Sequence, residues 1–303
     1  MTWTYPREPR VLFVHAHPDD ETLQTGATMA ACAARGARVT LVTCTLGEQG
    51  EVVADDLAAL AGDGAALGAH RLAELTAAMA ALGVVDHVRL GGDHHYRDSG
   101  MVWAADGTAT APPDLAPDAF WAADLREAAD HLVVLVRARR PHVLVTYDPA
   151  GGYLHPDHVQ AHRVATYAAA LAGVPTHRPD LGPAWAVPRT LWIAMPASHV
   201  RAAVEGWDGR PADLFVDGLV TDPDAPMLAT DADIAVAVDA RDQVARTLAA
   251  LAAYHSQLRP GSGYLGLPTE RSREFWGREF YRFAGGVPLP GGRPADDLFA
   301  GLA

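Results

Sequence analysis

Short apolar runs alternate with longer amphipathic stretches through the first half of the chain. The runs are rich in β-branched residues and have the length of buried strands: residues 11–14, 39–45, 85–90 and 142–146. Between and after them, apolar residues recur at helical spacing over residues 21–34, 72–82, 125–136 and 156–171. This alternation predicts an α/β fold, with a Rossmann-like, mostly parallel sheet and helices on both of its faces.

The second half of the chain is less regular. Residues 190–195 and 234–238 have strand patterns, and residues 241–258 have the pattern of a long helix. Loops are predicted at 175–188 and 259–272, the latter mobile and bordering a cleft, while 201–231 fit no element. We expect a single domain over 1–303: a Rossmann-like core (1–175), then a smaller irregular C-terminal portion (176–303) of completing strands, loops and a C-terminal helix.

Composition narrows the class of ligand. Hydrophobic residues make up 49% of the chain and charged residues 20%, as in an ordinary globular protein. The formal net charge of −13 repels polyphosphate, which argues against a nucleic-acid or anionic-membrane partner and favours a neutral, polyhydroxylated or cationic small molecule. No basic-then-apolar leader and no apolar run of roughly eighteen residues is present, so we expect a cytoplasmic protein. An oligomer remains compatible with the sequence.

The cysteines indicate which ligands a metal would have. Cys32 and Cys44 are the only two, and no close pair suggests a thiolate site. We expect both to be buried as small apolar groups. Histidine and carboxylate side chains would therefore have to hold any metal ion.

The first strand ends in a cluster of polar residues, HAHPDDE. His17 and Asp20 are three positions apart, so on the turn that opens a helix they project to the same side. They could give a metal ion one nitrogen and one oxygen ligand, while Asp19 between them could face a water on that metal. A structural interpretation is also open, in which the acids cap the helix and complement its positive end.

A second cluster, YDPAGGYLHPDHV, follows the strand at 142–146. His155 and His158 repeat the three-residue spacing, with Asp157 between them. Because parallel strands end at one edge of a sheet, both clusters are expected there. Two histidines and one carboxylate around Zn²⁺ leave a fourth position for water. The alternative is a proline-started helix with exposed histidines.

These two motifs give the chain a resemblance to a known family. HAHPDDE followed by HPDH resembles the metal-dependent LmbE-like sugar de-N-acetylases, also called the PIG-L family, most strongly from Val11 to His162. The strings VTCTLGEQGEV, RLAELTAAMAALGV and RDSGM narrow the resemblance to the subgroup that removes acetate from N-acetylglucosaminyl-inositol in mycothiol biosynthesis.

The resemblance implies roles for the polar residues. The metal ligands would be His17, Asp20 and His158, with Asp19 as the general base that takes a proton from the bound water. The implied metal is one Zn²⁺ per chain, although Fe²⁺ or Co²⁺ could occupy the same ligands.

Further residues have implied roles around the substrate. His155 would stabilise the tetrahedral intermediate or, when protonated, donate a proton to the leaving amine, and Asp157 would orient an imidazole. Tyr153 would polarise the carbonyl oxygen. Residues implied to grip the sugar and inositol hydroxyls are Arg71, Asp98 and Glu51.

Other polar and aromatic groups are expected to lie outside the site. We predict that Asp93, His94 and His95 form pocket rim or surface. His255 resembles a recurrent family element but equally suits a packed histidine, so we leave it out of the site. The aromatic residues near the C-terminus are expected in a core or interface rather than in a sugar-stacking platform: Trp276, Phe280, Tyr281 and Phe283.

Three rival functions remain at this level. A mycothiol S-conjugate amidase is disfavoured by two differences. By resemblance, the amidases have a lysine where this chain has Gln24, and the string GGERG where this chain has LGEQG. A deacetylase of another N-acetyl amino sugar shares the catalytic clusters. A non-catalytic carbohydrate-binding or zinc-storing protein would lack Asp19 or close the metal with a fourth ligand, and neither feature is evident.

Overall fold

A computed structural model describes residues 6–105, 108–208, 225, 227–261, 263–291 and 294–303. The strands are β1 (Arg10–His15), β2 (Arg38–Thr43), β3 (Asp86–Arg89), β4 (Val102–Trp103), β5 (Ala109–Thr110), β6 (Val143–Thr146), β7 (Arg189–Pro196), β8 (Leu228–Ala229), β9 (Val236–Asp239) and β10 (Arg278–Gly286). The helices are α1 (Asp20–Ala34), α2 (Gly64–Leu82), α3 (Leu125–Arg139), α4 (Pro156–Ala172), α5 (Ala197–Val204), α7 (Val244–Ala253) and α8 (Thr269–Trp276).

The main sheet has the strand order β3-β2-β1-β6-β7-β10-β9, with β8 paired to β7. Strands β3 to β7 in this order are parallel to their neighbours, whereas β10 is antiparallel to both β7 and β9. The predicted mostly parallel α/β sheet is therefore confirmed. The strands of the C-terminal portion extend the same sheet as those of the first 175 residues.

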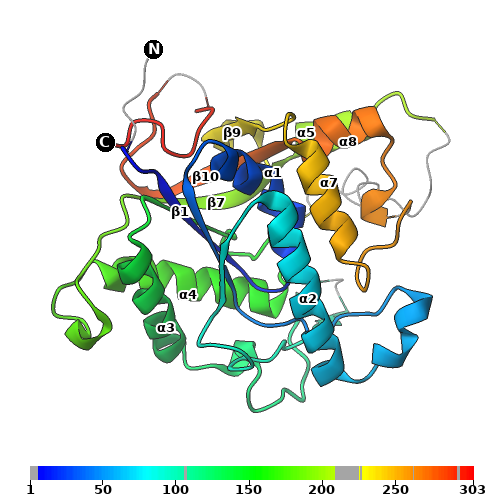
Figure 1. Cartoon of the computed structure of the whole chain (residues 1–303), viewed down its shortest axis with the longest axis horizontal. Coiled ribbons are helices and arrows are strands. Elements are labelled where there is room, and N and C mark those ends of the chain that lie inside the picture. The colour runs from blue at the N-terminus through cyan, green and yellow to red at the C-terminus, as the bar shows by residue number, and fades with distance from the viewer. Residues whose placement is uncertain (1–5, 106–107, 209–224, 226, 262, 292–293) are drawn as a thin grey trace.

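Both faces of the sheet are covered, which explains why β1 reads as a continuous apolar run. Successive side chains of a strand point to opposite faces. Val11 and Phe13 accordingly pack in one core with α1, α2 and α7, while Leu12 and Val14 pack in the other with α3 and α4. Figure 1 shows α3 and α4 together on one side of the sheet and α1, α2 and α7 on the other.

The direction of the strand order reverses between β1 and β6, which are neighbours in the sheet. From β1 the chain moves outward to β2 and β3, and it returns to the other side of β1 with β6 and then β7. In open α/β sheets, ligands bind outside the carboxyl ends of the strands at such a switch point. The two polar clusters of the sequence follow these two strands.

The C-terminal portion departs most from the sequence prediction. Strand β10 was not expected, α7 is shorter than the predicted 241–258 helix, and α8 begins inside the segment predicted as a loop. Helix α5 begins just after the predicted strand at 190–195 and ends inside the segment 201–231, to which no element was assigned. Residues 209–224 of that segment lie outside the described residues. Strand β10 alternates small, charged and aromatic residues, so its pattern is weak without knowledge of its two neighbours.

The expected burial of the cysteines is confirmed. Cys32 and Cys44 are both buried and unpaired. Burial raises the pKa of the Cys32 thiol to about 12, so it stays protonated and unreactive near neutral pH. Within the described part of the chain, no helix combines the length and apolar character needed to cross a membrane.

Strand β10 also brings a buried carboxylate against helix α1. Glu279 accepts hydrogen bonds from the backbone N–H groups of Ala27 and Thr28, both at 2.8 Å, and from the hydroxyl of Tyr281 at 3.2 Å. Burial nevertheless dominates and raises the pKa of Glu279 to about 7. The carboxyl group thus joins the antiparallel addition to the parallel core.

This carboxyl group predicts a pH-dependent stability. An unfolded Glu279 ionises near its ordinary pKa, so between about pH 4.5 and pH 7 the folded chain binds the extra proton and loses stability as pH rises. We expect the free energy of unfolding of the wild type, relative to Glu279→Gln, to fall by roughly 3 kcal/mol across this window. Urea unfolding of both proteins at pH 5 and pH 8 measures it, and parallel pH profiles would contradict the assignment.

Candidate metal and catalytic site

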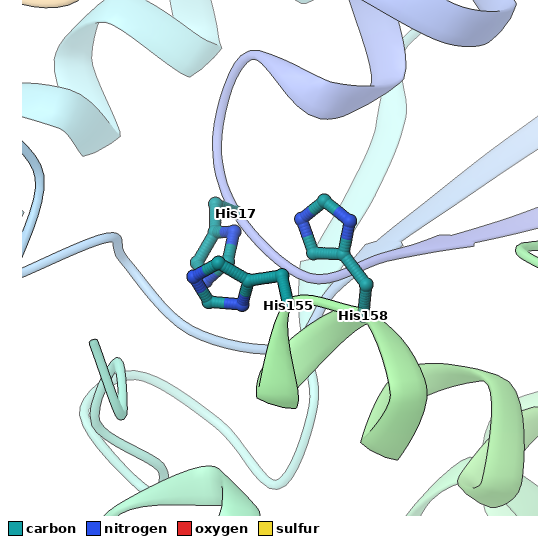
Figure 2. Close-up of side chains that lie close together, drawn as sticks. All are labelled: His17, His155 and His158. Carbon is teal, nitrogen blue, oxygen red and sulfur yellow. The ribbon is translucent and has the colours of Figure 1, made fainter. Parts of the chain in front are cut away.

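The two polar clusters meet at the switch point of the sheet. Figure 2 shows His17 in the loop after β1 and His155 and His158 at the start of α4, with the three rings gathered together. The ring centroid of His17 lies 4.7 Å from that of His155 and 5.3 Å from that of His158. All three side chains are buried, so the interpretation of HPDH as a helix start with exposed histidines is wrong.

The carboxylate of Asp20 lies close to both of the histidines predicted to bind metal with it. Asp20 Oδ2 lies 3.2 Å from His17 Nδ1 and 3.3 Å from His158 Nε2. Ligands at about 2.0–2.1 Å around a tetrahedral zinc lie roughly 3.3 Å from one another, so these spacings suit a zinc ion. His155 belongs to a second candidate set, in which one ring nitrogen each of His17, His155 and His158 all lie within 4.8 Å of one another.

The orientation of His158 supports metal binding directly. Its Nδ1 donates to the carbonyl oxygen of Gly151 at 3.1 Å, so Nε2 of the neutral ring carries a lone pair. That nitrogen is buried without a hydrogen-bond partner and faces the carboxylate of Asp20. Two electron-rich atoms facing each other in a buried place are stable only with a positive charge between them. The residues present therefore fit a divalent cation.

Gly151 makes this arrangement sterically feasible. Its φ is 61°, in the left-handed region that favours glycine. A Cβ there would come within 2.6 Å of the backbone nitrogen of Val159 and 2.7 Å of the Cβ of His158. The glycine pair of YDPAGGY thus lets the loop close over α4.

Tyr147 orients the carboxylate ligand. Its hydroxyl donates to Asp20 Oδ2 at 2.8 Å and accepts from the backbone N–H of Ala16 at 2.9 Å, while its ring stacks on His158 at 4.4 Å. A group that holds a metal ligand in place in this way sharpens the geometry of the site. Sequence analysis assigned Tyr147 no role, although its place directly after β6 was a usable signal.

Asp19 does not cap helix α1, so that structural interpretation fails for this residue. Its side chain makes no capping hydrogen bond, and its φ of 111° is unusual for a residue other than glycine. Its backbone N–H donates to Glu21 Oε2 at 3.0 Å. Glu21, which the sequence analysis also left without a role, in turn accepts from the Tyr254 hydroxyl. The backbone strain is thus balanced by contacts that hold Asp19 at the cavity.

Arg71 holds the other end of Asp19. Its guanidinium donates to Asp19 Oδ2 at 2.9 Å, to the carbonyl oxygen of Gly47 at 2.8 Å and to that of Pro18. Arg71 is buried and lines the cavity, so it reaches the site as expected. Its hydrogen bonds, however, are to Asp19 and to two backbone carbonyl oxygens of the protein itself.

The local field separates the two aspartates. Burial raises the pKa of Asp19 to about 7 against the opposing charge of Arg71. Burial also works to raise the pKa of Asp20, but the imidazoles of His158 and His17 hold it well below its ordinary range. One carboxylate is thus kept ionised as a ligand, while its neighbour can exchange a proton near neutral pH.

His155 sits at the N-cap of α4, and its Nδ1 accepts from the backbone N–H of Asp157 at 3.1 Å. Burial, followed by the neighbouring imidazoles of His17 and His158, lowers the pKa of His155 to about 2. Its Nε2 is therefore the nitrogen that can carry a proton.

The imidazole that Asp157 contacts is that of His17. Asp157 Oδ2 lies 3.2 Å from His17 Nε2 and accepts from the Ser99 N–H at 2.9 Å. The opposite ring nitrogen of His17 is the one that faces Asp20, so Asp157 is placed to orient a metal-binding ring.

A cavity of about 580 Å³ opens onto these groups. The remaining predicted site residues, Asp98, Glu51 and Tyr153, all line it. Asp98 is buried, with Oδ1 at 3.5 Å from His17 Nε2 and Oδ2 accepting from the Gln49 N–H, while Glu51 is exposed at the rim. The Tyr153 ring lies 5.1 Å from that of His158. The structure thus brings eight of the ten predicted site residues to the lining of one cavity, and the other two, Asp157 and His158, are buried against the lining residues His17 and Asp20.

Comparisons with known proteins agree with this geometry. The model of the family PIG-L, described as GlcNAc-PI de-N-acetylase, matches residues 12–169, which is just over half of the chain. This chain belongs to the PIG-L family. The matched segment contains both polar clusters and the strands β1 and β6 that position them.

Two curated relatives of this PIG-L protein cover nearly its whole length. One from Nocardioides sp. (strain ATCC BAA-499 / JS614) is 50% identical over 97% of this chain and 99% of its own. Another from Kribbella flavida is 48% identical over 97% and 98% of the respective chains. Both are named 1D-myo-inositol 2-acetamido-2-deoxy-alpha-D-glucopyranoside deacetylase.

Solved structures share the fold at low sequence identity. N,N'-diacetylchitobiose deacetylase from Pyrococcus horikoshii has a TM-score of 0.58 and 19% identity, covering 92% of this chain and 84% of that one. The zinc-inhibited form of teicoplanin deacetylase Orf2 has a TM-score of 0.53 and 18% identity, covering 90% and 97%. At such identities the likeness concerns the fold alone.

The C-terminal portion of this PIG-L protein supplies an apolar wall of the cavity, contributed by Ile193, Met195, Phe275, Trp276 and Phe280. Of the aromatic residues predicted to be core or interface, Trp276 and Tyr281 are buried and Phe283 is exposed. Phe280 is half-buried and lines the cavity, as does Trp276. The core assignment therefore holds for Trp276 and Tyr281, and the cavity wall was not foreseen.

The histidines left out of the site do lie elsewhere. Asp93, His94 and His95 are exposed, in agreement with the prediction. His255 is also exposed and pairs with Asp56 at 2.9 Å, so the idea of a packed histidine is wrong.

Proposed function

We propose that this PIG-L protein hydrolyses the acetamide of N-acetylglucosaminyl-inositol, the 1D-myo-inositol 2-acetamido-2-deoxy-α-D-glucopyranoside of its relatives' name, to the free amine and acetate. The observation that carries the proposal is the 45–50% identity over nearly the whole chain with relatives of that name. Their match extends beyond the metal motifs and includes the C-terminal segments that wall the cavity. The reaction would take place in the cytoplasm, within mycothiol biosynthesis.

His17, Asp20 and His158 would hold one divalent cation, which we take to be Zn²⁺, with Fe²⁺ or Co²⁺ as alternatives for the same ligands. When bound, such an ion supplies a polarised water and a positive charge for the oxygen of the acetamide carbonyl. The protein's contribution is to fix both relative to the substrate.

Asp19 would be the general base. It takes a proton from the water as the oxygen attacks the acetamide carbon, and its contacts with Arg71 and Glu21 keep the carboxylate aimed at the cavity. A carboxylate held in one rotamer in this way loses little entropy when it reacts.

His155 and Tyr153 would act on the other side of the acetamide. Because Nδ1 of His155 already accepts a backbone N–H, we assign it the neutral form with the proton on Nε2. In a doubly protonated ring, the N–H at Nδ1 of His155 would face the backbone N–H of Asp157, and two donors cannot form a hydrogen bond with each other. In the neutral form His155 donates a hydrogen bond to the developing oxyanion, with Tyr153 as a second donor, and the proton that Asp19 took from the water passes to the departing nitrogen.

The deciding experiment is acetate release by the zinc-loaded protein from three substrates: N-acetylglucosaminyl-inositol, free N-acetylglucosamine and a mycothiol S-conjugate. We expect the first to have the highest kcat/KM. A preference for the conjugate would assign the chain to the amidases, and a preference for the free sugar to another amino-sugar deacetylase. Absence of turnover with all three, despite bound metal, would favour a binding protein.

Arg71 offers a test of how Asp19 is positioned. In Arg71→Lys, the ammonium cannot reproduce the fork that contacts Asp19, Gly47 and Pro18 together. We expect kcat to fall by roughly 100-fold with KM changed little, because the base loses its alignment. Steady-state kinetics decides the matter: a rise in KM at unchanged kcat would make Arg71 a substrate ligand instead.

A further inference from the structure

A second group of metal-binding side chains lies on the surface, away from the cavity residues. His95 Nε2 is 2.9 Å and His131 Nε2 is 2.7 Å from the same oxygen, Oε1 of Glu127. The two imidazole centroids are 4.7 Å apart. Glu127 and His131 are one turn apart on α3, whereas His95 comes from the loop after β3. Two imidazole nitrogens and a carboxylate oxygen therefore converge from two elements.

The loop backbone is shaped so that His95 reaches α3. Gly91, Gly92 and His94 all have positive φ, at 73°, 100° and 61°. A Cβ on Gly91 would come within 2.6 Å of the His95 ring, which occupies the space a side chain would need. Because His94 is not a glycine, its positive φ costs conformational energy, and the contacts of the residues that follow must offset that cost.

Tyr96 fixes the carboxylate. Its ring is buried beside Phe120, and its hydroxyl donates to Oε2 of Glu127 at 2.6 Å. The other oxygen, Oε1, is left facing the two histidines. This is the pattern by which a neighbouring donor orients a carboxylate ligand and selects the oxygen that binds. All three side chains are partly exposed, so solvent and ions can reach the cluster, and Glu127 and His131 also line a hollow of about 320 Å³.

We propose that His95, Glu127 and His131 form a second metal site, specific for a transition cation such as Zn²⁺, Ni²⁺ or Cu²⁺. Two imidazoles and one carboxylate suit these ions, whereas Mg²⁺ and Ca²⁺ prefer oxygen ligands. Binding requires the two nitrogens to move outward by only a few tenths of an ångström, from hydrogen-bond distance of the oxygen to the roughly 3.3 Å spacing of tetrahedral ligands.

The site would fasten the active-site loop to the helix. His95 is three residues before Asp98, whose side chain lies in the catalytic cavity. A cation at this position joins that loop to α3 and restricts its movement. The site is distinct from the catalytic one, because none of its three ligands lines the catalytic cavity.

The test is isothermal titration calorimetry with Zn²⁺ on chain already carrying one zinc, in a buffer that does not bind metal. We expect one further equivalent to bind. His131→Ala and His95→Gln, from opposite sides of the cluster, should each abolish that equivalent or weaken it at least about tenfold, and Tyr96→Phe should weaken it by about tenfold. His94→Asn is the matched control, because asparagine tolerates the positive φ of this position, and it should bind both equivalents.

Retention of the first zinc in each variant shows that the chain has folded. The proposal is overturned if the wild type takes up no second equivalent, or if His131→Ala and His95→Gln bind it as tightly as His94→Asn does. Because the readout is metal uptake at surface positions, its result does not depend on whether the chain is a deacetylase.

Discussion

Asp19→Asn is expected to lower the rate of deacetylation by about 10²–10⁴-fold while leaving one zinc bound per chain. The amide cannot accept a proton from the attacking water. It does preserve the shape of the side chain, it can still accept a hydrogen bond from Arg71, and asparagine tolerates positive φ better than alanine does. Acetate release measures the rate, and elemental analysis of the purified variant measures the metal.

Asp242→Asn provides the control. Asp242 is an exposed aspartate just before α7 whose side chain bonds to Gln243, outside the cavity lining. We expect it to turn over at the wild-type rate. A general base typically contributes about 10²–10⁴-fold to the rate. If Asp19→Asn retained more than about a tenth of wild-type kcat, the loss would be too small for removal of the base, and another group would have to be the base.

His158→Ala is expected to abolish metal binding at the catalytic site and, with it, turnover. The variant removes the buried Nε2 that faces Asp20, and it leaves the Gly151 carbonyl oxygen without its donor. Loss of one of three protein ligands lowers affinity below that needed to hold zinc during purification, and the polarised water is lost with the ion. Metal content and acetate release should fall together.

His162→Ala is the matched control for this prediction. His162 lies one turn further along α4, and its Nδ1 likewise bonds a backbone carbonyl oxygen, that of Tyr147, at 2.9 Å. We expect it to keep its zinc and most of its activity. Zinc retained at the catalytic site of His158→Ala, measured in a His131→Ala background that lacks the proposed surface site, would show that His158 is not a ligand, because both candidate ligand sets contain it.

The site was largely readable from the sequence because its chemistry is local. His17 and Asp20 are brought together by one turn of chain, and His155 and His158 by the first turn of α4. Which acid would be ligand and which would be base was implied only by resemblance. The physical difference between Asp19 and Asp20 comes from Arg71, Tyr147 and the two imidazoles, which no short pattern contains.

The supporting contacts were less predictable. Tyr147, Glu21 and Tyr254 orient the aspartates through hydrogen bonds that span up to 233 residues of sequence. Arg71 was predicted to bind substrate, and the structure adds hydrogen bonds from its guanidinium to Asp19 and to two carbonyl oxygens. A single sequence contains no record of such distant pairings.

The sequence by itself determined the parallel core, since strands buried on both faces must be apolar throughout and the helices that cover them must repeat at helical spacing. It also predicted the candidate metal-binding histidines and aspartates, which lie within one turn of each other in each cluster. Only the tertiary structure decided the antiparallel insertion of β10, the cavity wall and the partners of Asp19. These three features depend on which surfaces meet when the chain folds. The contacts that stabilise them join segments that are far apart in the sequence, so no local pattern specifies them.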